Sequence, residues 1–117
     1  MTFSDTVANV RLCRGAELTA IVGRDGIAVQ IWGPASVETE ELVAEYANFL
    51  REVFAANREL QLGQLDQVVL ATERKVTMVT AINDEYFVMA VVRADGLVGK
   101  ARFHSRIAAY RLRAEFS

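Results

Sequence analysis

Several residue types are scarce in this chain of 117 residues, and each scarcity narrows what the protein can do. The chain contains one cysteine, Cys13, one histidine, His104, and one proline. A single cysteine excludes an intramolecular disulfide and fits a reducing compartment, so we expect a cytoplasmic protein. One cysteine and one histidine also fall short of the ligand set that a zinc or other transition-metal site needs. We therefore expect no bound metal.

Long hydrophobic runs and an excess of one charge are missing too. The longest apolar stretches, such as residues 86–92, are much shorter than the roughly 20 residues that cross a bilayer. Residues 1–10 lack the basic and then apolar regions of an export signal. Thirteen basic and fifteen acidic side chains give a net charge of -2, which supplies no global attraction for nucleic acid. We expect neither membrane insertion nor nucleic-acid binding.

A catalytic constellation is not evident either. His104 lies among basic neighbours, and the sequence nominates no acid or nucleophile to work with it. Cys13 is flanked by arginines, which can lower a thiol pKa, but a small apolar residue at the end of a helix is the simpler interpretation. Residues 96–101 superficially resemble a phosphate-binding loop, yet the spacing is short and Ala101 stands where a serine or threonine would hold magnesium. We expect no catalytic residue, no cofactor and no intrinsic enzyme activity.

The first half of the chain predicts a short helix, a hairpin and a long helix. Apolar residues recur at helical spacing over residues 3–12, behind Thr2 or Ser4 as a cap. β-Branched and apolar residues predict strands over residues 17–22 and 27–32, joined by a turn at residues 24–26. The long helix is predicted over residues 37–60, with Ser36 or Thr39 as its cap and Gly63 closing it.

The second half predicts three strands and a final helix. The strands cover residues 65–72, 75–82 and 86–93, and the short polar segments between them imply antiparallel neighbours. Asp95 is the predicted cap of a helix over residues 97–116. The order α-β-β-α-β-β-β-α predicts one α+β domain over residues 1–117 with a five-stranded antiparallel sheet. The long helix covers one face and the N- and C-terminal helices cover the other, a profilin-like arrangement of three layers.

The apolar residues of the long helix cover about half of its circumference. At 100° per residue they form two neighbouring strips, one of Leu42, Tyr46, Phe49, Val53, Ala56 and Leu60, and a second of Val43, Ala47, Leu50 and Phe54. A helix lying on its own sheet needs an apolar arc of only about 100°. The second strip is therefore covered either by another helix of the same chain or by a second molecule, and we predict self-association through this strip and through the exposed strand at residues 65–72. The predicted dimer interface consists of Val43, Ala47, Leu50, Phe54, Val68 and Leu70.

The chain as a whole resembles the roadblock / dynein light-chain superfamily. The resemblance rests on the order of elements, on AIVGRDGIAVQ at residues 20–30, on EELVAEYANFLREVFAANREL at 40–60 and on LGQLDQVVLATERKVTMVTAINDEYFVMAVV at 62–92. In the final part, DGLVGKARFHSRIAAYRL, Gly99 and Arg102 are in register with the family pattern at the start of its last helix. A short N-terminal helix is the main departure from the family pattern.

This resemblance implies a homodimer formed through the central helix and the adjacent strand edge. It also implies a platform for a Ras-like small GTPase, which in bacterial members includes stimulation of GTP hydrolysis by the partner. We predict that the GTPase contacts the charged arc of the long helix at Glu45, Asn48, Arg51 and Glu52. A scaffold subunit without effect on nucleotide turnover is the alternative. A small-molecule sensor is a third possibility, although the sequence places no convergent polar groups for one.

Overall fold

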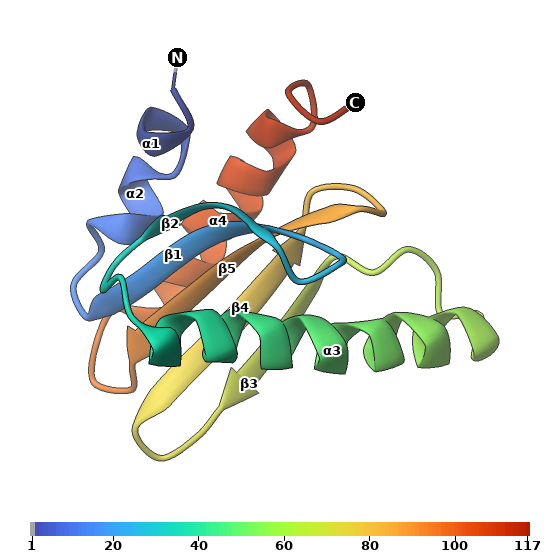
Figure 1. Ribbon diagram of the computed structural model, residues 1–117, viewed down its shortest axis with the longest axis horizontal. Coiled ribbons are helices and arrows are strands. Elements are labelled where there is room, and N and C mark those ends of the chain that lie inside the picture. The colour runs from blue at the N-terminus through green and yellow to red at the C-terminus, as the bar shows by residue number, and fades with distance from the viewer. Residues whose placement is uncertain (1) are drawn as a thin grey trace.

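The computed structural model describes residues 2–117 and contains one antiparallel sheet of five strands in the order β2-β1-β5-β4-β3. Helices lie on both sides of this sheet, with α3 across the front in Figure 1. In chain order the elements are α1 (Phe3–Thr6), α2 (Ala8–Arg11), β1 (Ala16–Gly23), β2 (Ala28–Trp32), α3 (Val37–Glu59), β3 (Gln67–Ala71), β4 (Lys75–Ala81), β5 (Tyr86–Arg93) and α4 (Val98–Leu112). This confirms the predicted fold class and order.

Two separate apolar clusters fill the spaces on either side of the sheet. One joins α1, α2 and α4 to the sheet and includes Val7, Val10, Met78, Val92 and Leu112. The other joins α3 to the opposite face and includes Ala20, Val43, Leu50, Val79 and Met89. Successive strand residues point to opposite faces, which is why neighbours such as Met78 and Val79 belong to different clusters. The predicted arrangement of three layers is confirmed.

The β1–β2 hairpin closes through the predicted turn at residues 24–26. Gly26 has a φ of 89°, a conformation that side chains disfavour, and its N–H donates to the Gly23 carbonyl at 2.9 Å. The Ile27 N–H donates to the Asp25 carboxylate at 3.0 Å, as turn aspartates commonly allow. An added Cβ on Gly26 would lie 3.6 Å from the Ala47 Cβ, so the turn packs closely against α3.

Both ends of α3 are capped, but the C-terminal cap differs from the prediction. At the start, the Ser36 hydroxyl accepts the Thr39 N–H at 3.1 Å, as predicted for Ser36. At the end, Gln61 takes the left-handed conformation with a φ of 56°. Gln61 and Leu62 donate to the carbonyls of Arg58 and Asn57 at 3.1 and 3.3 Å, which is a Schellman motif. The prediction that Gly63 closes the helix is therefore wrong by two residues.

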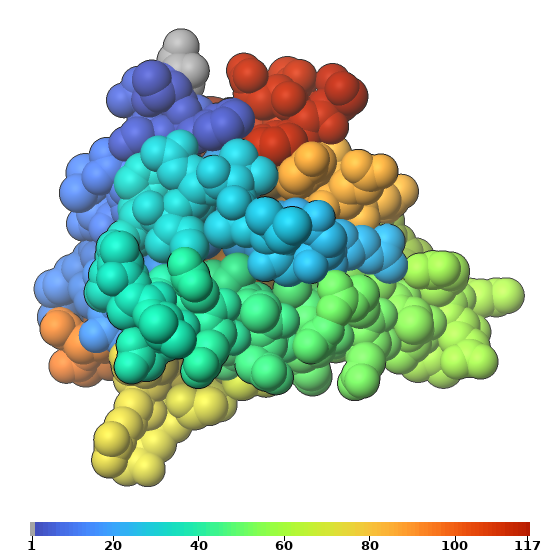
Figure 2. Space-filling model, in the orientation of Figure 1, coloured from blue at the N-terminus to red at the C-terminus, as the bar shows by residue number. Residues whose placement is uncertain are grey.

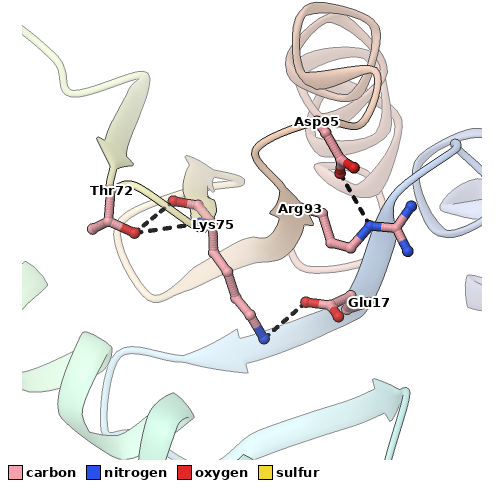
Figure 3. Close-up of polar contacts among 5 residues, drawn as sticks. All are labelled: Glu17, Thr72, Lys75, Arg93 and Asp95. Carbon is pink, nitrogen blue, oxygen red and sulfur yellow. Dashed lines mark hydrogen bonds and ion pairs between the residues drawn. The ribbon is translucent and has the colours of Figure 1, made fainter.

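The start and end of the last helix were also predicted incorrectly. Its N-cap is Leu97, and Asp95 instead accepts a hydrogen bond from Arg93 Nε at 3.2 Å (Figure 3). The helix ends at Leu112 rather than at Phe116. The Phe116 ring lies 5.5 Å from Phe3 and 4.4 Å from Tyr86, between ring centroids. This aromatic packing replaces the last predicted helical turn.

An ion pair links two strands that are not neighbours in the sheet. Lys75 Nζ, at the start of β4, lies 2.8 Å from the Glu17 carboxylate of β1, across the intervening strand β5 (Figure 3). At the β3–β4 turn, Thr72 Oγ1 donates to the Lys75 carbonyl at 2.9 Å and fixes the start of β4. Both charges are partly exposed, so this pair contributes at most about 1 kcal/mol. We assign these residues a structural role.

No helix within residues 2–117 has both the length and the apolar content required to cross a membrane.

Candidate functional site

The side of α3 that faces the sheet is the second apolar strip. Val43, Ala47 and Leu50 are only 1–2% exposed and pack with Val79, Phe87 and Met89 of the sheet. They have no surface left for a second molecule. Placing them in the dimer interface was therefore wrong, because they form the core of their own chain. Phe54 is half-buried at the edge of the same cluster.

The first apolar strip remains accessible along the flank of α3. Phe49 is 41% exposed and Leu60 is 67% exposed, whereas Leu42, Tyr46 and Val53 are half-buried. Leu42 and Tyr46 pack at the margin of the α3 cluster together with Val68 of β3. At 100° per residue the flank lies on the opposite side of α3 from Arg51, which contacts the β1–β2 turn, so the flank faces away from that turn and toward the β3 edge of the sheet. We call Leu42, Tyr46, Phe49, Val53 and Leu60 the flank strip.

Strand β3 borders this strip and is an edge of the sheet. Its five residues pair with β4 on one side, from Gln67 opposite Thr80 to Ala71 opposite Val76. The order of strands leaves its other side without a neighbouring strand within the described chain. Val68 and Leu70 are half-buried, and they share a face of the sheet because they are two residues apart. In Figure 2 the β3–β4 turn projects past α3.

The four residues predicted to contact a GTPase lie on the solvent side of α3. Glu45, Asn48, Arg51 and Glu52 are all exposed. Arg51 donates from Nη1 to the Arg24 carbonyl at 2.8 Å and from Nη2 to the Asn48 side chain. The structure thus brings Asn48 and Arg51 together with the β1–β2 turn, while the side chains of Glu45 and Glu52 form no hydrogen bond or ion pair within residues 2–117.

A hollow near the C-terminal end of α3 was not predicted from the sequence. It has a volume of about 350 Å³, and its lining includes Arg24, Phe54, Arg58, Leu65 and Asp84. The Arg24 guanidinium lies 4.9 Å above the Phe54 ring and donates to the Asp84 carbonyl at 3.2 Å. Arg24 thereby connects α3 with both turns at this end of the sheet. Only the helical spacing of Phe54 and Arg58 could have signalled the hollow, since the turns are distant in sequence.

The residues considered for catalysis do not form a site. Cys13 is buried, and its Sγ lies 3.5 Å from the Leu97 carbonyl. His104 lies on α4, where its ring contacts Phe103 edge-on at 5.4 Å between centroids. Within residues 2–117, no group of three or more histidine, cysteine or carboxylate side chains is arranged to hold a metal ion. The surfaces that stand out are the flank strip with β3, and the charged arc beside it.

Comparisons with known proteins agree with this architecture. The Roadblock/LC7 domain matches residues 2–94, whereas no curated protein matches the sequence. MglC from Myxococcus xanthus is 28% identical, with a TM-score of 0.68 over 98% of this chain and 99% of that chain. The gliding protein MglB from Thermus thermophilus is 18% identical, with a TM-score of 0.83 over 98% and 90%. A structure of MglB with a tetrameric arrangement is also 18% identical, with a TM-score of 0.82 over 96% and 85%. The chain belongs to the Roadblock/LC7 domain family.

Proposed function

We propose that this protein is a non-catalytic homodimer that binds a Ras-like small GTPase and regulates it. The observation that carries the proposal is the accessible flank strip of α3, which adjoins the open edge of β3 and lies next to a charged arc. Membership of the Roadblock/LC7 family supports it, because the resemblance to that family implies a GTPase platform. The MglB neighbour with a tetrameric arrangement supports self-association of a protein with this fold.

The dimer would form by pairing two flank strips and two β3 edges. From Leu42 to Leu60 the strip extends for roughly 27 Å along the helix, at 1.5 Å per residue. Exposed apolar strips of this length are typical of interfaces, and unpaired strand edges readily accept another strand. A two-fold axis allows both contacts to form at once, because each contact then uses the same residues of the two copies. Val68 and Leu70 then keep the interface role that the sequence predicted, and the flank strip replaces the second strip.

The GTPase would bind the charged arc, which pairing leaves exposed. All four residues are exposed, but at 100° per residue only Glu45 and Glu52 border the flank strip, whereas Asn48 and Arg51 lie toward the β1–β2 turn. Dimerisation would bring Glu45 and Glu52 of both copies onto one surface. Exposed positions of α3 include six glutamates and two arginines, which favours a partner with a basic contact surface. The six glutamates are Glu38, Glu40, Glu41, Glu45, Glu52 and Glu59.

Any stimulation of GTP hydrolysis would act by repositioning groups of the GTPase. An arginine finger must reach the transferring phosphate. Arg51 is instead held by the Arg24 carbonyl and Asn48, and Arg24 stacks on Phe54. Neither arginine is available without breaking contacts within its own chain. The proposal requires only that the protein bind the GTPase, and stimulation of GTP hydrolysis is an additional part of it.

Affinity capture from a lysate of the source organism tests the proposed partner. The immobilised protein is exposed to lysate with a non-hydrolysable GTP analogue or with GDP, and bound proteins are identified by mass spectrometry. Retention of a small GTPase mainly with the analogue supports the proposal and supplies the substrate for a hydrolysis assay. Retention of the same non-GTPase proteins with the analogue and with GDP contradicts the proposal and favours the scaffold alternative.

A double substitution tests the proposed interface. Phe49→Glu with Val53→Glu places two charges in the flank strip and should convert a dimer of twice 13.0 kDa into a monomer in light scattering. Ala55→Glu with Ala44→Glu is the matched control, because it adds the same charge at exposed positions outside the strip. A dimer mass that persists in the Phe49 and Val53 variant would rule out this interface.

A further inference from the structure

We propose that the outer face of α4 binds an acidic, amphipathic segment of a partner protein. This surface lies on the opposite side of the sheet from α3 and is distinct from the GTPase and dimer surfaces (Figure 1). It surrounds a hollow of about 370 Å³ between α4 and the adjoining ends of β3 and β4. We call it the α4 groove and define it by the lining residues Asp66, Thr80, Phe103, Arg106, Tyr110 and Arg113.

The charge of α4 is opposite to that of α3. α4 carries Lys100, Arg102, Arg106 and Arg111 and contains no acidic residue, and Arg113 follows it directly. Within residues 2–117 the ion pairs are Lys75 with Glu17 and Arg93 with Asp95, so the arginines of the groove have no carboxylate partner there. Arg106 and Arg113 are exposed and can each receive a carboxylate in a two-pronged contact.

Aromatic side chains on the same face add apolar area to this charge. Phe103 is 60% exposed and Tyr110 is 70% exposed. They are seven residues apart, so they project from the same side of α4, two turns from one another. The Arg113 guanidinium lies 5.5 Å from the centre of the Tyr110 ring. Exposed aromatic residues beside arginines are the side chains most enriched where proteins bind one another.

Gln67 holds the groove in shape from the sheet side. Its Nε2 donates to Thr80 Oγ1 at 3.0 Å and to the Arg102 carbonyl at 3.4 Å. Arg102 Nε in turn donates to Gln67 Oε1 at 3.4 Å. These contacts join α4 to β3 and β4 beside Thr80, which lines the hollow. The groove is therefore formed before any partner arrives, which reduces the entropic cost of binding.

An acidic amphipathic segment matches this surface better than a polyanion does. Asp66 contributes a carboxylate to the hollow and the chain carries a net charge of -2, and both oppose a dense row of phosphates. A helical segment with glutamates on one side and leucines on the other can place carboxylates on Arg106 and Arg113. Its apolar side chains can then cover Phe103 and Tyr110, as in helix-in-groove recognition.

Fluorescence anisotropy with a synthetic peptide tests the groove directly. The probe is a labelled helical peptide of about 18 residues with glutamate and leucine at amphipathic spacing. Binding should weaken as salt increases, because its charge contacts lie at the surface. Arg106→Glu should weaken it roughly tenfold or more, and Tyr110→Ala should weaken it roughly fivefold with no change in charge. Arg58→Glu on α3 is the matched control and should change affinity by less than about twofold.

Two further probes separate the alternatives. These are single-stranded DNA of matched length and vesicles that contain phosphatidylserine. The proposal is overturned if the peptide does not bind at low salt, if Arg58→Glu weakens binding as much as Arg106→Glu, or if DNA or vesicles bind more tightly through Arg106. Peptide binding that persists in the Phe49→Glu and Val53→Glu variant would show that the groove works independently of the dimer.

Discussion

Two neighbouring residues of α3, Leu50 and Phe49, should respond to truncation in opposite ways. Leu50 is 2% exposed in the cluster under α3, so Leu50→Ala removes core contacts and leaves a cavity. Such truncations cost about 2–5 kcal/mol, a large part of the roughly 5–15 kcal/mol that stabilises a domain. We expect a loss near 3 kcal/mol and a melting temperature lower by roughly 10 °C.

Phe49→Ala should instead affect association. Its ring is 41% exposed in the single chain, so truncation removes little core packing there. A central aromatic residue of an interface contributes about 2 kcal/mol or more, which is roughly 30-fold in the dissociation constant. Urea unfolding at two protein concentrations about 100-fold apart separates the two effects, because only a dimer unfolds at a midpoint that depends on concentration.

The two variants should change the urea midpoint of unfolding in different ways. Leu50→Ala should lower the midpoint at both concentrations and keep the shift between them. Phe49→Ala should reduce that shift by favouring the monomer at the lower concentration. The assignment of the two strips is refuted if Leu50→Ala leaves the midpoint unchanged, or if Phe49→Ala lowers the free energy of unfolding by several kcal/mol at both concentrations.

Other parts of the chain supply three more predictions. Arg51→Ala with Glu52→Ala should weaken binding of the captured GTPase in calorimetry without changing the dimer mass, and unchanged affinity would remove both residues from the GTPase surface. Gln61→Gly should stabilise the protein by about 1 kcal/mol in chemical denaturation, because the left-handed conformation strains a side chain, whereas Gly63→Ala, at a φ of 95°, should destabilise it. The Thr2 hydroxyl, followed by the Thr2 backbone N–H, lowers the pKa of Asp5 below its ordinary 3.8, so the cap of α1 is complete above 3.8 and is lost as the pH falls through the lower folded value. NMR titration should show this lowered pKa and its rise toward the ordinary range in Thr2→Ala, which removes the hydroxyl and keeps the backbone N–H, and an identical titration of both proteins would contradict the capping assignment.

Most of the fold is encoded in local patterns that can be read from the sequence. Apolar segments bounded by short polar connections gave β4 and β5 almost residue for residue, and the Arg-Asp-Gly turn located the first hairpin. Helical periodicity located α3 to within one residue at its C-terminal end. The errors occurred where a tertiary contact competes with a local preference. Asp95 pairs with Arg93 instead of capping α4, and Phe116 packs on Phe3 and Tyr86 instead of extending it.

The two strips of α3 illustrate why the apolar surface that stays accessible was harder to predict. Both strips are apolar, and the periodicity of the helix cannot say which one faces the sheet. That choice is made by the connection from β2 and by the hairpin turn, whose Gly26 approaches Ala47 closely. The α4 groove was encoded too, in the spacing of Phe103 and Tyr110 and in the lack of acidic residues, but its hollow depends on β3 and β4.

The mass of the complex with the captured GTPase tests the central claim most directly. Light scattering of the protein mixed with that GTPase, loaded with a GTP analogue or with GDP, reports both stoichiometry and nucleotide dependence. We predict a complex that contains two copies of this chain and forms with the analogue. In the Phe49→Glu and Val53→Glu variant, we predict either no complex or a complex with one copy of the chain. A complex with a single copy of the chain, or equal binding with GDP, would contradict the account.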